Sequence, residues 1–152
     1  MVISKFNGDF DFLSNFFSSP IRYEGMVYPT VEHAFQAAKT MDMAKRREIA
    51  GLPTPGAAKR AGRQVTLRPD WEEVKVDVME TLLREKFSNP HLNFCLRITD
   101  GHFLEEGNNW CDNFWGVCRC PRCNGNGRNQ LGKLLMKIRA EAIEAKRAEN
   151  EN

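Results

Sequence analysis

Residues 28–39 read Tyr-Pro-Thr-Val-Glu-His-Ala-Phe-Gln-Ala-Ala-Lys and contain the clearest periodic pattern in the chain. Thr30 is a residue type that caps helices through its hydroxyl group. The apolar residues that follow recur at helical spacing, at Val31, Ala34, Phe35 and Ala38. The pattern predicts a helix over about residues 30–40 with one apolar face turned to the core.

Turn and cap residues divide the flanking sequence into short elements. The stretch 20–28 reads as a hairpin around Glu24-Gly25. Asp70 and Glu73 have capping-box spacing at the start of the longest apolar stripe. The expected helices cover about 41–50, 54–62, 70–87, 89–97 and a segment from Asn129, and the expected strands cover about 64–67 and 103–105.

Length and composition support one folded domain. The chain has 152 residues, of which 41% are hydrophobic and 28% charged, so a disordered or coiled-coil chain is excluded. We therefore expect a single helix-rich α+β domain over residues 1–152 with small β elements. The charged tail from about Glu144 is expected to fray.

The net charge and the hydropathy of the chain limit the classes of partner that it can be expected to bind. The formal net charge of +2 is too small to indicate a polyanion partner, so any anion must bind at a local site. No stretch is long and apolar enough to span a bilayer, and the first residues lack the apolar core of a signal peptide. We expect a soluble cytoplasmic protein without a membrane partner.

Three polar residues share one edge of the helix predicted over 30–40. Steps of 100° place Glu32, Gln36 and Lys39 within a strip about 60° wide beside the apolar stripe. Burial there would raise the pKa of the carboxyl and lower the pKa of the amine, which supplies a general acid and a nucleophile. The alternative is a solvated flank of an amphipathic helix, and spacing alone favours it. His33 points away from the stripe, which favours a surface or capping role.

The segment 107–129 is rich in glycine and asparagine yet contains two tryptophans, which is typical of a functional loop. Asp112 follows Trp110 and precedes Trp115, so aromatic walls could desolvate its carboxylate. Asp-Asn is also a common turn pair, and a turn role is the simpler reading. Trp115 is a candidate wall for a base, although tryptophans more often pack a core.

The turn 125–132 leads directly into the last predicted helix. Free backbone N–H groups and the helix dipole at such a start attract phosphate, and Arg128 adds charge. The string matches no known phosphate-binding fingerprint, and an Asn129 N-cap explains much of it.

Four of the five cysteines fall in the same loop, at Cys111, Cys118, Cys120 and Cys123. Only Cys120 and Cys123 have C-x-x-C spacing, and no second such pair follows. The spacing therefore favours unliganded thiols over a structural zinc at these four positions, and we expect no cofactor.

Four ordered strings carry a family resemblance: Asp11-Phe-Leu-Ser-Asn-Phe16, residues 28–39, Asp112-Asn-Phe-Trp-Gly116, and Gly127-Arg-Asn-Gln-Leu-Gly-Lys-Leu-Leu-Met136. Together they resemble the YbiA-like family, also called NADAR, over about residues 5–139. The resemblance implies a small helix-rich α+β fold and an N-glycosidase. Family members act on ribosylaminopyrimidine phosphates of riboflavin biosynthesis or remove ADP-ribose from guanine. The insertion 118–123 occurs in only part of the family, so the resemblance supports no metal role.

The resemblance implies catalytic roles for Glu32, Lys39 and Asp112 and pocket positions for Asn15, Trp115 and Asn129. With the residues derived from the helix edge and the turn, the expected substrate-binding set is Asn15, Gln36, Trp115, Gly127, Arg128 and Asn129. We expect these groups to share one pocket. The expected partner is a small nucleotide or an ADP-ribosylated guanine, either free or within nucleic acid.

Two chemical routes remain open at this point. An unprotonated Lys39 can form a Schiff base with the opened sugar while Glu32 moves protons. A carboxylate can instead activate water for direct displacement. Two functions without catalysis also remain: a module that only binds ADP-ribose or a nucleotide, and a zinc-stapled interaction module.

Overall fold

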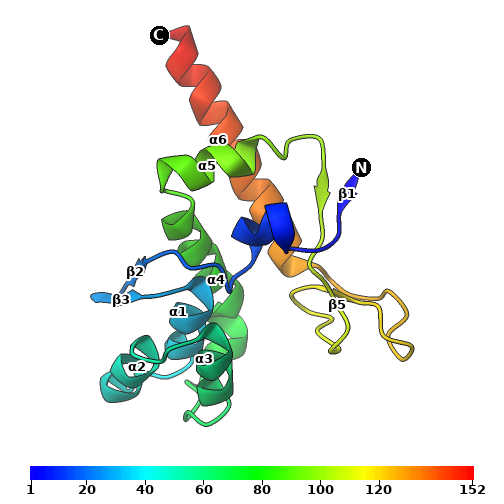
Figure 1. Cartoon of the computed structure of the whole chain (residues 1–152). Coiled ribbons are helices and arrows are strands. Elements are labelled where there is room, and N and C mark those ends of the chain that lie inside the picture. Colours follow the sequence, from blue (N-terminus) through cyan, green and yellow to red (C-terminus); the bar gives the residue numbers. More distant parts are fainter. The chain divides into compact units, whose positions relative to one another are not determined.

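The computed structural model describes all residues 1–152 and shows a helix-rich α+β fold with few short strands (Figure 1). Its contacts form two compact units. The terminal unit contains residues 1–14 and 89–152, and the middle unit contains residues 15–88. Each unit is described by itself.

The middle unit begins with the predicted hairpin. Strands β2 (Ile21–Tyr23) and β3 (Met26–Tyr28) pair antiparallel, with Ile21 opposite Tyr28. The two turn residues Glu24 and Gly25 both have positive φ, at 44° and 85°. A two-residue turn of this hand matches the twist of the strands, which is why the hairpin closes at this point.

Helix α1 (Val31–Ala38) is the core of the middle unit. The Thr30 hydroxyl accepts a hydrogen bond from the backbone N–H of His33, which confirms the predicted cap. All eight helical residues are buried, because α1 packs against α2 (Met43–Ala50), α3 (Pro55–Gly62) and α4 (Trp71–Lys86). The expectation of one buried face was too modest, since the neighbouring helices cover the others.

A buried arginine fixes the entry to α2. The Arg46 guanidinium donates to the backbone carbonyl of Thr40 at 2.8 Å and to the Glu24 carboxylate at 2.5 Å. It also lies 5.7 Å from the centre of the Tyr23 ring. Because a buried cation is costly unless it is paired, these contacts tie the hairpin turn to the helices.

Three local expectations in the middle unit were wrong. Residues 64–67 form turn and coil, not a strand. Asp70 lies at the N-cap position of α4 but does not cap it, because both carboxylate oxygens accept from Arg68 at 2.6 and 3.0 Å. In this pair both partners are charged, whereas a capping bond joins the carboxylate to a neutral backbone N–H. His33 is 1% exposed, so the surface role was wrong. Its ring bonds to the hydroxyl of the N-cap residue Thr30 and to the Leu52 carbonyl, which is compatible with the capping role that was the other expectation.

The terminal unit brings both ends of the sequence together. Strand β1 (Val2–Ile3) pairs in parallel with β4 (Phe103–Leu104), and β5 (Gly107–Asn108) pairs in parallel with β6 (Val117–Cys118). The 3-10 helix η1 (Gly8–Leu13) contacts α5 (Pro90–Arg97), and α6 (Gln130–Glu151) contacts α5 and β4.

Helix α6 includes the tail that was expected to fray and continues through Glu151. Its last turns are rich in Glu, Ala, Lys and Arg, which are strong helix formers, and Lys146 pairs with Glu149 at 2.8 Å. No helix in the chain combines the length and apolar character that crossing a bilayer requires.

Candidate active site

Glu32 lies in the first turn of α1, and the residue is 8% exposed. Its backbone N–H donates to the carbonyl of Asn15 at 3.0 Å, which joins the start of the helix to the segment before the hairpin. One turn later, Nε2 of Gln36 donates to Oε1 of Glu32 at 2.7 Å. The amide therefore fixes the orientation of the carboxylate.

Two buried amide oxygens in this region lack hydrogen-bond partners. They are Oδ1 of Asn15 and Oε1 of Gln36. The Asn15 amide nitrogen donates only to the sulfur of Met79, at 3.6 Å. Buried polar atoms in proteins are nearly always paired, and each exception needs an explanation, such as strain, a catalytic role or a bound water or ion. These unpaired oxygens distinguish the Glu32 edge from ordinary helix packing.

Gly62 of α3 makes room for Gln36. A Cβ atom at this position would lie 1.8 Å from Oε1 of Gln36, a distance that no side chain can accept. Only glycine lets α3 approach α1 closely enough to hold the amide beside Glu32.

Lys39 follows α1 immediately and is half-buried. Burial lowers the pKa of its amine from the ordinary 10.5, and the nearby charges of Arg63 and Lys59 lower it further, against an opposing effect of Glu32. The amine lies 5.8 Å from the centre of the Phe35 ring. A lowered pKa increases the fraction of free amine at a given pH, and the free amine is the form that a nucleophile requires.

The structure thus brings together four expected site residues of the middle unit, at Asn15, Glu32, Gln36 and Lys39. Glu32 and Gln36 are buried and bonded to each other, so the solvated-flank reading does not apply to them. The helix edge combines a fixed carboxylate with an amine whose pKa is lowered by burial.

In the terminal unit, Asp112 organises the loop between β5 and β6. Its Oδ1 accepts from the backbone N–H groups of Phe114 and Trp115 at 3.2 and 2.9 Å. This is the turn role that its sequence allowed. The Asn108 side chain bonds to both the N–H and the carbonyl of Asp112, at 3.1 and 2.8 Å.

An aromatic pair lies next to Asp112. Phe114 and Trp115 pack edge to face with ring centres 4.8 Å apart. The Arg128 guanidinium lies 5.8 Å from the centre of the Phe114 ring, and Arg128 is exposed to solvent. A cation beside an aromatic surface is an arrangement suited to binding a nucleotide.

The expectation of free backbone N–H groups before α6 was wrong. The N–H groups of residues 128–131 donate to carbonyls of residues 113–116, at 2.8 to 3.3 Å. The start of α6 therefore binds the Asp112 loop in place of a phosphate. Gly127 permits this contact, since a Cβ there would lie 2.1 Å from the carbonyl oxygen of Gly116.

Asn129 also differs from its expected N-cap role. It adopts a left-handed conformation with φ 52° and makes no side-chain cap bond. Its amide instead donates to the Leu104 carbonyl at 2.9 Å and accepts from the Glu106 N–H at 3.1 Å. These bonds give the buried side chain a structural role between β4 and α6. The expectation that the residues of the two units share one pocket stays a prediction.

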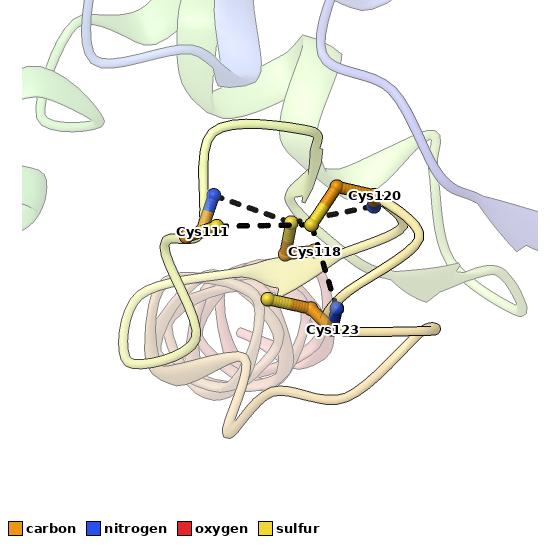
Figure 2. A group of neighbouring side chains, drawn as sticks. All are labelled: Cys111, Cys118, Cys120 and Cys123. Atoms are coloured by element: carbon orange, nitrogen blue, oxygen red, sulfur yellow. Dashed lines mark hydrogen bonds between the residues drawn. The ribbon is translucent and has the colours of Figure 1, made fainter.

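Four cysteines gather in the same loop (Figure 2). The sulfur atoms of Cys111, Cys118, Cys120 and Cys123 all lie within 4.8 Å of one another. They are the group in this chain with the spacing and chemistry to hold a metal ion.

The sequence pattern did not identify two residues that position site side chains. Gly62 carries no side chain whose pattern could reveal it, and only its position against Gln36 gives it a role. Asn108 was one of several asparagines in a loop, and its bonds to Asp112 depend on the β5–β6 pairing. The Gly62–Gln36 contact is distant in sequence, and the Asn108–Asp112 contact spans four residues of a loop without a recognisable motif.

Several known proteins resemble this chain in sequence. Residues 3–142 match the profile of the NADAR domain. An N-glycosidase YbiA of Shigella flexneri serotype 5b is 42% identical over 142 residues, which cover 90% of this chain and 83% of the relative. A riboflavin biosynthesis protein of Vibrio vulnificus is 35% identical over 136 residues, covering 88% of this chain but 36% of that protein.

A solved structure is also similar to this chain in fold. The NMR structure of the E. coli protein YbiA superposes with a TM-score of 0.79 at 36% sequence identity, covering 96% of this chain and 86% of that one. Both the sequence and the fold therefore match along most of the chain. The chain belongs to the NADAR domain family.

Proposed function

We propose that this chain is an N-glycosidase, a hydrolase that cleaves the bond between the anomeric carbon of a ribose phosphate and the amino group of a base. The observation that carries the proposal is the buried Glu32 carboxylate, held by Gln36 at 2.7 Å on the same helix edge as Lys39 with its lowered pKa. The names of the relatives, N-glycosidase and riboflavin biosynthesis protein, support the same reaction type.

Two substrate classes fit this chemistry. One is ADP-ribose attached to guanine, and the other is a ribosylaminopyrimidine phosphate of the riboflavin pathway. Both join the sugar to an exocyclic amine, and both present amino and hydroxyl donors. The unpaired oxygen of Asn15 is suited to accept a hydrogen bond from such a donor.

Our preferred route uses Lys39 as a transient nucleophile. Glu32, in its acid form, protonates the ring oxygen of the sugar, and the ring opens to an imine between C1 and the base nitrogen. The neutral amine of Lys39 adds to C1, and the base amine leaves after taking up a proton. Water then hydrolyses the Schiff base, which regenerates the lysine and releases the sugar.

Asp112 and Arg128 have assigned roles in the same proposal. We assign Asp112 as the second carboxylate, although its Oδ1 also holds the turn at Phe114 and Trp115. Arg128 is exposed and carries a positive charge beside an aromatic ring, so we assign it to the ribose phosphate or pyrophosphate.

The test presents both substrate classes to the purified protein side by side and follows base release by chromatography. Release from either class supports an N-glycosidase, and the faster class identifies the substrate. Binding of ADP-ribose without base release from either class would instead identify a non-catalytic nucleotide-binding module and overturn the proposal.

A further inference from the structure

The cysteine cluster offers a site that the proposed N-glycosidase reaction does not use. Its four sulfur atoms come from positions 111, 118, 120 and 123 and lie within 4.8 Å of one another. The Cys111 and Cys120 sulfurs are 3.7 Å apart, and Figure 2 shows all four side chains converging on one point of the loop.

The distances match a tetrahedral metal site. A zinc ion with Zn–S bonds of about 2.3 Å places its four thiolate sulfurs about 3.8 Å from one another. The Cys111–Cys120 separation already has this value. The largest separation requires a contraction of only about 1 Å, which side-chain rotation can supply.

Backbone N–H groups point at the sulfurs. The Cys118 sulfur accepts from the N–H groups of Cys111 and Cys120, at 3.2 and 3.4 Å. The Cys120 sulfur accepts from the N–H of Cys123 at 3.4 Å, and the Asn113 amide donates to the Cys123 sulfur at 3.3 Å. Donors of this kind stabilise thiolates and orient metal ligands.

The pairing of β5 with β6 explains how Cys111, seven residues before Cys118 in the sequence, lies beside the other cysteines. Strand β6 places Cys118 opposite Asn108 of β5, and the intervening loop returns Cys111 to Cys118. Cys111 has φ 65°, a conformation that costs energy for a residue with a side chain. A bond from Cys111 to a metal would offset that cost and the entropy of ordering a loop rich in glycine.

We propose that Cys111, Cys118, Cys120 and Cys123 bind one structural zinc ion as four thiolates. Binding releases the four thiol protons to solvent and involves no change of oxidation state. All four coordination positions are filled by protein sulfur, so the ion takes no part in the reaction. It would stabilise the loop that carries Asp112. The spacing of the cysteines in the sequence favoured unliganded thiols, but the distances between their sulfur atoms favour a zinc site.

The test measures metal and thiols on the purified full chain. We expect about one zinc per chain by elemental analysis, and its release when a thiol-blocking reagent modifies the cysteines. Replacing zinc with Co²⁺ should give the thiolate charge-transfer absorption of a tetrahedral site. These measurements use the wild-type protein, so they remain decisive even where a variant fails to fold.

The variants compare cluster and non-cluster cysteines. Cys120→Ser and Cys123→Ser should lose most of the zinc, and Cys95→Ser, outside the cluster, should retain it. Five freely titrating thiols without metal, a mass about 2 Da low from a disulfide, or iron in place of zinc would each overturn the proposal. None of these results depends on glycosidase activity.

Discussion

Nε2 of Gln36 lies 2.7 Å from Oε1 of Glu32, one turn away on the fully buried helix α1. The contact fixes the carboxylate beside the lysine that follows the helix. The proposed chemistry depends on this edge.

Replacing Glu32 with Gln should abolish most turnover and leave the fold intact. The glutamine oxygen can still accept the bond from Gln36, but it cannot transfer a proton. Loss of general acid catalysis reduces rates by about 10²–10⁴, which steady-state kinetics would measure. The matched control is Glu48→Gln, at an exposed position of α2, which should retain full activity. An active Glu32→Gln enzyme would remove the carboxylate from the mechanism.

Lys39→Ala should keep substrate binding and lose nearly all turnover, because no nucleophile remains to form the Schiff base. Borohydride added during turnover should trap a sugar adduct on the wild-type protein, and peptide mass spectrometry should locate it at Lys39. The exposed Lys45→Ala serves as the control. An active Lys39→Ala enzyme together with no adduct would leave direct displacement by water as the route.

The pH profile should report the free amine of Lys39. The route requires Lys39 as the free amine and Glu32 as the acid, so kcat/KM should follow a bell-shaped pH profile. Because burial lowers the pKa of the Lys39 amine, the inflection that Lys39 contributes should lie below 10.5. Arg63→Gln removes a neighbouring positive charge, so the pKa of Lys39 and the inflection should move to higher pH. Arg47→Gln on α2 should leave the inflection in place, and a downward shift in Arg63→Gln would contradict the assignment.

Two glycines of α3 give a matched pair of stability variants. Gly56→Ala adds a methyl group in ordinary contact with Arg60 and should raise the free energy of unfolding by about 0.5–1 kcal/mol. Gly62→Ala places the methyl group on Gln36 and should lower both that free energy and the activity. Denaturant unfolding and the activity assay together test this. Equal, stabilising effects of both changes would show that Gln36 is not held by Gly62.

Arg128→Ala should weaken binding of ADP-ribose roughly tenfold or more, since a charged hydrogen bond is worth about 1.5–3 kcal/mol. Titration calorimetry can measure the change, with the exposed Arg122→Ala as the control in the same loop. Equal affinities for wild type and Arg128→Ala would remove the guanidinium from the binding site.

The local pattern predicted α1 and its Thr30 cap, because both depend on residues close in sequence. The burial of Glu32 and Gln36 could not be predicted in this way, since it depends on how α2, α3 and α4 pack around the helix. Asp70 shows that a local pattern can also fail for a contact between residues close in sequence. Its capping-box spacing was present, but the pairing with Arg68 removed its oxygens from the helix.

The loop residues between β5 and α6 show why the spacing of residues in the sequence is not sufficient to assign a site. The turn before α6 has the composition of a phosphate loop, yet its N–H groups bind carbonyls of the Asp112 loop. The cysteines have only one C-x-x-C pair, and the β5–β6 pairing brings Cys111 to the other three. Both features depend on contacts between segments that no local motif records.

The central claim is that the Glu32 edge cleaves an N-glycosidic bond. The most direct measurement is chromatographic release of base from ADP-ribosylated guanine and from a ribosylaminopyrimidine phosphate, by wild type, Glu32→Gln and the Glu48→Gln control. We expect release from at least one class by wild type and by the control, and almost none by Glu32→Gln. Equal release by all three proteins, or no release from either substrate by any of them, would contradict it.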